Sequence, residues 1–89
     1  MISLTTERFW KAFTKLPESV QTQAKKIYAL WQNDPYHPSL DFKKIHPKRP
    51  IYSVRIGIHW RAIGVKEDET ITWFWIGSHA DYDKLIDDL

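Results

Sequence analysis

The sequence predicts a single α+β domain over residues 1–89, with an N-terminal helical hairpin, a four-stranded and mostly antiparallel sheet, and a C-terminal helix. Three observations support this. Apolar residues recur every three to four positions in the first third of the chain, as on one face of a helix. From residue 40 onward they alternate with polar ones, as in strands. Short turns join the later strands, and short turns favour antiparallel pairing. A length of 89 residues fits one such domain.

Two helices are predicted in the first third. The first covers residues 6–15, and Thr5 or Thr6 is a suitable N-cap. Pro17 interrupts this pattern and can occupy the first turn of a second helix. The second helix ends before Pro35, because the residue preceding a proline avoids helical backbone angles. The short link between the helices predicts an antiparallel hairpin.

Four strands are predicted next, followed by a last helix. The strands cover residues 40–45, 51–56, 59–65 and 70–76, and a basic loop with two prolines separates the first two. The fourth strand is so apolar that we expect it in the interior of the sheet. Ser78 is suited to cap the last helix, with Asp81 three positions later. We expect the helices to pack on one face of the sheet.

Several protein classes are excluded by composition. The chain has no cysteine, which excludes a disulfide scaffold and a cysteine-based zinc site. Four scattered histidines have no metal-ligand spacing, and three glycines cannot form a glycine-rich phosphate loop. No apolar stretch approaches the roughly 20 residues that cross a bilayer, and the N-terminus lacks a signal-peptide pattern. We therefore expect a cytoplasmic protein with no cofactor, no bound metal and no membrane partner.

The charge is distributed unevenly although the net charge is only +2. Residues 42–61 carry six Lys and Arg and no acidic residue, whereas residues 81–88 carry four Asp and one Lys. A basic centre with an acidic tail indicates an anionic partner for the centre. A solvated basic face is the alternative interpretation.

Strand alternation gathers part of this charge on one face of the sheet. Ser53 and Arg55 share a face of the second strand, and Arg61 lies near the start of the next strand. If helices cover the apolar face, the other face presents Arg55 and Arg61 together with Lys43. Guanidinium groups pair well with phosphate oxygens. Nearby rings are suited to stack on the bases of single-stranded RNA, although core packing is the alternative for each of them. These rings are Trp60, Trp73, Trp75 and Tyr82.

His79 is the most informative single residue. It follows the apolar strand and lies in the first turn of the last helix. Imidazole is the side chain whose ordinary pKa lies nearest neutral pH, which suits a general acid or base. Tyr82 lies three residues later on the same helix face. A capping or simply exposed histidine is the alternative. No acidic general base is evident on the first strands.

Four segments, taken in order, resemble the RelE/ParE toxin superfamily of type II toxin–antitoxin modules. They are Lys15-Leu16-Pro17 after the first helix, residues 34–44 (DPYHPSLDFKK), residues 52–64 (YSVRIGIHWRAIG) and residues 73–82 (WFWIGSHADY). Each motif is weak alone, but their order is fairly specific and covers nearly the whole chain. The resemblance implies a small α+β toxin that a cognate antitoxin binds in a hetero-oligomeric complex.

The resemblance also implies a reaction and the residues that perform it. RelE-like toxins cleave messenger RNA on the ribosome without a metal, by attack of a 2′-hydroxyl on the adjacent phosphate. Arg61 matches the family arginine that holds the scissile phosphate, and Arg55 matches the arginine before the turn. His79 and Tyr82 match the C-terminal catalytic positions. Basic residues that bind RNA are expected at Lys43, Lys44, Lys48 and Arg49.

Two alternatives remain open within the same superfamily. ParE-like members share the fold but inhibit DNA gyrase and do not cleave RNA. A degenerate homologue would bind its antitoxin without being toxic. The nuclease hypothesis requires Arg55, Arg61 and His79 to converge on one exposed patch.

Overall fold

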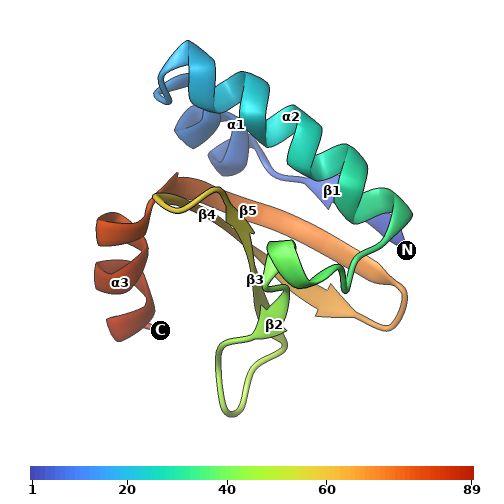
Figure 1. Cartoon of the computed structure of the whole chain (residues 1–89). Coiled ribbons are helices and arrows are strands. Elements are labelled where there is room, and N and C mark those ends of the chain that lie inside the picture. The colour runs from blue at the N-terminus through green and yellow to red at the C-terminus, as the bar shows by residue number, and fades with distance from the viewer.

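The computed structural model describes all 89 residues and contains one five-stranded sheet with helices on both sides (Figure 1). The strand order is β1-β5-β4-β3-β2. The elements are β1 (Ile2–Thr5), α1 (Glu7–Thr14), α2 (Glu18–Asn33), the 3₁₀ turn η1 (Pro38–Leu40), β2 (Lys43–Lys44), β3 (Ile51–Ile56), β4 (Trp60–Glu67), β5 (Thr70–Ser78) and α3 (His79–Asp87). The α+β fold class is confirmed. No helix is both long and apolar enough to cross a membrane.

The helical hairpin forms as its sequence predicts. Thr6 is the N-cap of α1, and its hydroxyl accepts the backbone N–H of Phe9 at 3.1 Å. Pro17 stands at the N-cap of α2. The side-chain amide of Gln21 donates to the carbonyls of Phe13 and Leu16, at 3.2 and 3.1 Å. These two bonds add to the backbone hydrogen bonds at the end of α1 and hold the two helices together.

The sheet contains one strand that the sequence analysis missed. β3, β4 and β5 form the antiparallel meander that was predicted, while β1 pairs with β5 in parallel and forms one edge. β1 has only four residues, too few for a period-two pattern to stand out. The strand predicted over residues 40–45 is reduced to Lys43 and Lys44, because Leu40 ends η1 and Asp41 has a left-handed backbone with φ of 45°.

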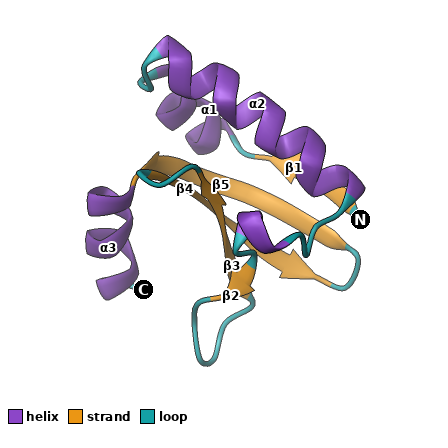
Figure 2. Cartoon of the chain, viewed as in Figure 1, coloured by secondary structure: helices purple, strands orange, loops and turns teal.

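The expectation that all helices share one face is wrong for α3. α1 and α2 cover one face of the sheet and α3 covers the other (Figure 2). The reason lies in the strands, since Ile51 and Ile63 alternate away from the helical hairpin and are nevertheless apolar. α3 buries both of them under Tyr82, with Leu85 and Ile86 packed alongside.

Aromatic rings fill the face under the hairpin, and a bulge carries two more to the α3 face. Trp31 of α2 is buried and meets Phe42 and Trp73 edge-on, with ring centroids 5.8 and 5.4 Å apart. The β4–β5 register shifts between Ile63 and Gly64. A β-bulge puts an extra residue into one strand, and here Phe74 and Trp75 both pack against the α3 cluster.

Candidate functional site

A buried arginine is the centre of a polar network under α3. Arg61 of β4 is only 7% exposed. Its Nη2 donates to the carboxylate of Asp41 at 2.8 Å, and its Nη1 donates to the hydroxyl of Ser53 at 3.3 Å. Three segments of chain therefore meet at one guanidinium. Such charge-assisted bonds are stronger than neutral ones and fix the direction of the planar group.

Tyr82 covers this guanidinium from α3. The Cζ atom of Arg61 lies 5.3 Å from the centroid of the tyrosine ring, within cation–π range. The hydroxyl of Tyr82 donates to Ser53 Oγ at 3.3 Å, so the fully buried Ser53 accepts from both partners. The Nε of Arg61 is buried with no hydrogen-bond partner. The result is a desolvated positive charge held in one orientation.

Asp41 joins a second cation to the network. Its carboxylate lies 3.4 Å from the ammonium of Lys43 and 2.8 Å from Arg61 Nη2, both measured to Oδ2. The hydrogen bond from Arg61 is the main cause that lowers the pKa of Asp41, and Lys43 contributes to the same effect. Sequence reasoning missed Asp41 as a site residue. Its only local signal is the position directly after a proline-initiated turn.

The predicted cations lie on the same face of the sheet, but they differ in exposure. Arg55 and Arg61 are direct cross-strand partners, and Lys43 pairs in register with Ser53. Partners in register project to the same face, so these side chains share the α3 side. Arg55 and Lys43 are exposed. The expectation of an exposed Arg61 is wrong, because Tyr82 and α3 cover it. Arg61 therefore does not join Arg55 and His79 on one exposed patch, as the sequence analysis required.

His79 lies next to this network at the first residue of α3. Its backbone N–H donates to the carbonyl of His59 at 2.7 Å, which ties the start of α3 to the β3–β4 turn. Its ring centroid is 5.6 Å from that of Tyr82. Its Nε2 lies 3.6 Å from the carboxylate of Asp83, and its side chain is 47% exposed. The imidazole is therefore accessible to solvent beside the ring that covers Arg61.

The remaining basic residues lie on the hairpin side of the sheet or in the loop between β2 and β3. Lys44 pairs in register with Tyr52 and so faces the hairpin side of the sheet, away from Arg61. Lys48 and Arg49 are exposed in the β2–β3 loop, and their backbone N–H groups donate to His46 Nδ1 at 3.0 and 2.9 Å. Since Nδ1 accepts, Nε2 carries the ring proton and donates to the carbonyl of Leu89 at 2.9 Å. His46 thus fastens the basic loop to the end of the α3 segment.

Most of the rings considered for base stacking belong to the core. Trp73 and Tyr82 are buried, and Trp60 packs against the hairpin-side cluster. Trp73 and Tyr82 are therefore not available to a nucleotide in this structure, and Trp60 is half-buried. Trp75 is half-buried on the α3 face.

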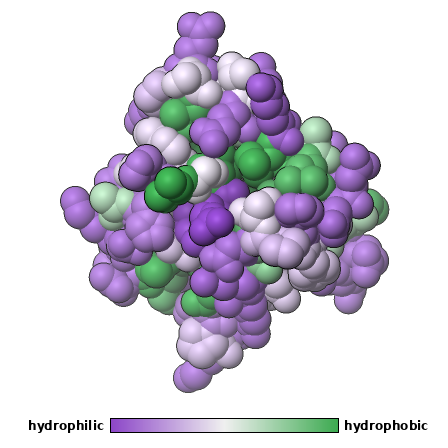
Figure 3. All heavy atoms as spheres, viewed as in Figure 1, coloured by the Kyte–Doolittle hydropathy of each residue, from purple (hydrophilic) through white to green (hydrophobic).

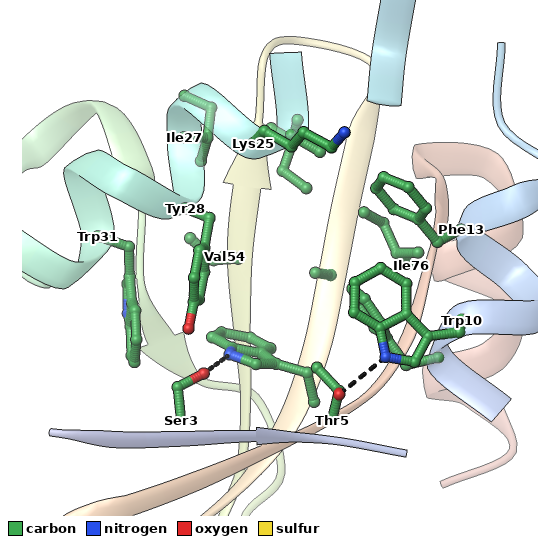
Figure 4. A pocket seen from close by; sticks show the side chains of 15 residues that line it. Ser3, Thr5, Trp10, Phe13, Lys25, Ile27, Tyr28, Trp31, Val54 and Ile76 are labelled. Carbon is green, nitrogen blue, oxygen red and sulfur yellow. Dashed lines mark hydrogen bonds between the residues drawn. The ribbon is translucent and has the colours of Figure 1, made fainter. Parts of the chain in front are cut away.

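A second surface feature lies on the opposite face of the sheet from this network. It is an apolar groove of about 350 Å³ between α1, α2, β1 and the sheet. Figure 4 shows Trp10 and Phe13 of α1 facing Tyr28 and Trp31 of α2 across it, with Lys25 at the rim. Figure 3 shows hydrophobic atoms in a band above the centre of this view and in scattered spots, on a surface that is otherwise mostly hydrophilic.

Comparison with known protein families shows which family the chain belongs to. The sequence model of the ParE-like toxin domain matches residues 18–84, three quarters of the chain. The chain belongs to the ParE-like toxin domain family. It is thereby a member of the RelE/ParE toxin superfamily, as its motifs indicate. No curated protein sequence matches it.

Solved structures show the same fold at low sequence identity. A chain of the RelB–RelE antitoxin–toxin complex from Methanococcus jannaschii superposes with a TM-score of 0.73 at 22% identity, covering 92% of this chain and 96% of that one. YafQ from Escherichia coli gives 0.72 at 13% identity, covering 90% and 94%. A YoeB/ParE toxin from Agrobacterium tumefaciens gives 0.67 at 10% identity, covering 89% and 99%. Every residue of the Arg61 network lies inside the segment matched by the ParE-like family.

Proposed function

We propose that this ParE-like domain is the toxin of a type II toxin–antitoxin module and cleaves messenger RNA on the ribosome. The observation that carries the proposal is the set of cations on the α3 face, with the imidazole of His79 beside the Arg61 network. Similarity to the RelE and YafQ toxins supports the assignment to a toxin. The cleavage mechanism is the one that the resemblance to RelE-like toxins implies, applied to the residues of this chain.

The exposed cations and the buried cation have different roles in this proposal. Arg55 and Lys43 reach solvent and are suited to pair with the oxygens of an RNA phosphate. Arg61 lies directly across the ladder from Arg55, fixed by Asp41 and Ser53. A charge that is already desolvated and oriented stabilises negative charge in the transition state without reorganising. Arg61 therefore acts as a fixed positive charge behind the two accessible cations.

His79 supplies the proton transfer in this scheme. Its imidazole takes the proton of the ribose 2′-hydroxyl as the 2′-oxygen forms a bond to the adjacent phosphorus. The bond between phosphorus and the 5′-oxygen breaks, and solvent protonates that oxygen. The products are a 2′,3′-cyclic phosphate and a 5′-hydroxyl. Tyr82 is buried and bonded to Ser53, so we assign it the role of positioning Arg61.

The basic loop gives the RNA a path toward this site. Lys48 and Arg49 are exposed, and His46 holds the loop against the end of the α3 segment. Contacts of this kind to phosphates add affinity without reading the base sequence, and they weaken as salt is added. Lys44 points toward the hairpin side, so we assign it at most a peripheral contact.

The test compares two pairs of variants in a purified translation system. Replacing Arg55 by Met or His79 by Asn is expected to lower the rate of mRNA cleavage on ribosomes by about 10² to 10⁴-fold. Both side chains are exposed, so the variants are expected to unfold at the same urea concentration as the wild type. His59→Asn and Arg8→Met are the matched controls, with cleavage near the wild-type rate. Unchanged cleavage in the Arg55 and His79 variants would overturn the proposed mechanism.

Inhibition of DNA gyrase is the second candidate, and the ParE-like family match is the observation that favours it. It predicts that the purified chain blocks supercoiling by gyrase and leaves mRNA on ribosomes intact. The same preparation can be used in both assays, so the two activities are compared directly. A chain inactive in both assays would be the degenerate homologue.

The partner we propose is a cognate antitoxin that inserts an amphipathic helix into the apolar groove of Figure 4. The groove lies open beside edge strand β1, and its aromatic walls include the half-exposed Trp10 and Tyr28. Lys25 at the rim favours an acidic residue on the helix. An amphipathic helix with apolar residues on one face and acids on its flank fits both features.

A further inference from the structure

We propose that Asp41 is the positioning residue of the site, holding Arg61 and Lys43 in one arrangement for an RNA phosphate. This inference rests on the proposed nuclease function and deepens it, because the scheme above uses Asp41 only as a partner of Arg61 and not as the residue that also holds Lys43. Asp41 touches the cations, not the RNA. Its carboxylate is the shared acceptor of a buried guanidinium from β4 and an exposed ammonium from β2.

No other carboxylate contacts Arg61 or Lys43. The other acidic residues in ion pairs are Glu7, bonded to Lys11, and Asp83, near His79. Neither reaches Arg61 or Lys43. Residues 42–61 contain no acid at all, and the two cations of this stretch that form ion pairs, Lys43 and Arg61, both pair with Asp41. Without it, Lys43 has no ion-pair partner, and Arg61 keeps only its hydrogen bond to Ser53 and the ring of Tyr82.

The backbone presents this carboxylate from a rigid segment. Asp41 lies between Leu40 and Phe42, which are both buried in the core. Its own backbone is left-handed, with φ of 45° and ψ of 44°, and its N–H donates to the carbonyl of Pro38. Asp and Asn tolerate this conformation better than other residues with a Cβ. The position thus suits a short side chain that bears either a carboxylate or an amide.

A carboxylate here has opposite effects on binding and on cleavage. Its negative charge repels an approaching phosphate and competes for the same donors, which weakens RNA binding. The same charge orients Arg61 and Lys43, and small errors in the position of catalytic groups cost about 10²-fold in rate. Substitution by Asn removes only the charge and so separates the two effects, because Asn has the same shape as Asp and tolerates the same left-handed backbone conformation.

The experiment compares Asp41→Asn with Asp68→Asn. Asp68 is the other non-glycine residue with positive φ, and it is exposed in the β4–β5 turn. The two variants therefore share the substitution, the backbone class and the change in net charge. For Asp41→Asn we expect kcat for mRNA cleavage on ribosomes to fall about ten- to a hundredfold, with KM unchanged or lower. Asp68→Asn is expected to keep the wild-type kcat, and Asp41→Glu to recover part of it.

The possible failures can be told apart. If the wild type cleaves mRNA and Asp41→Asn retains its kcat within twofold, the positioning role is overturned while the nuclease function stands. A loss of kcat with a matching rise in KM would also overturn it, since Asp41 would then support binding. If the wild type itself cleaves nothing, the proposed function is overturned. In that case NMR still tests whether Asp41 orients Arg61. The chemical shift of the Arg61 Nε–H group is expected to change in Asp41→Asn and not in Asp68→Asn.

Discussion

The two faces of the sheet are stabilised by different interactions. Under the helical hairpin, Trp31 meets Phe42 and Trp73 edge-on in an apolar core that needs no charged partner. Under α3, the buried side chains include Arg61 and Ser53, which depend on hydrogen bonds to be tolerated there. Apolar packing is non-directional, whereas a buried charge needs partners at set distances. The α3 face is therefore the one where the orientation of individual groups is controlled.

The same comparison separates binding surfaces by type. The hairpin face opens into an apolar groove with aromatic walls, suited to a helix of another protein. The α3 face carries Arg55 and Lys43 at its surface over the fixed Arg61, suited to phosphate. One small sheet can thus serve two partners of different chemistry. The three predictions below test this division, from the largest expected effect to the smallest.

The largest effect is expected from breaking the polar network of the α3 face. Arg61→Met keeps much of the side-chain volume but leaves Ser53 and Tyr82 without their shared partner, and we expect a loss of about 2 kcal/mol in the free energy of unfolding. Arg55→Met changes the same residue type on the same face at an exposed position, and we expect less than about 0.5 kcal/mol. Urea unfolding measures both. Equal losses would show that the network does not stabilise this face.

An intermediate effect is expected on the hairpin face. Tyr28→Ser removes a ring from the groove wall, and we expect the dissociation constant of the antitoxin complex to rise about tenfold, or about 1.4 kcal/mol. Tyr36→Ser is the control, because Tyr36 is 64% exposed but does not line the groove, whereas Tyr28 is 38% exposed and does. Calorimetric titration measures the affinities. If both variants bind equally well, the antitoxin contacts another surface.

The smallest effect is expected from the pH dependence of Asp41. Because Arg61 lowers the pKa of this carboxyl in the folded state, the ion pairs stabilise the fold above the unfolded-state pKa of about 3.9. That stability is lost as pH falls through the lower folded-state pKa. The side chain is 37% exposed, so we expect wild type and Asp41→Asn to differ by less than about 1 kcal/mol at pH 6. Urea unfolding at pH 6 and at pH 2 should show this difference disappearing in acid; a constant difference would argue against the ion pairs.

Much of the fold was predictable because its signals are local. The stripe that includes Phe9, Phe13 and Leu16 marks α1 and its link to α2, and the observed Thr6 cap confirms where α1 begins. Alternation in β3 assigned Ser53 and Arg55 to one face, as found. β1 and the shortening of β2 were not predictable, because both depend on pairing with distant segments. β1 needs β5, some 68 residues away in the register Ile2 to Thr70.

For the site, the sequence by itself determined which side chains share a face, because period-two alternation is a property of any strand. Only the tertiary structure decided that α3 packs over that face, that Tyr82 buries Arg61, and that Asp41 reaches Arg61 across 20 residues of chain. These contacts depend on how whole elements pack, and the packing minimises exposed apolar surface over the entire molecule. No local sequence pattern encodes packing over the whole molecule. The burial of Arg61 and its hydrogen-bond partners therefore follow only from the tertiary structure.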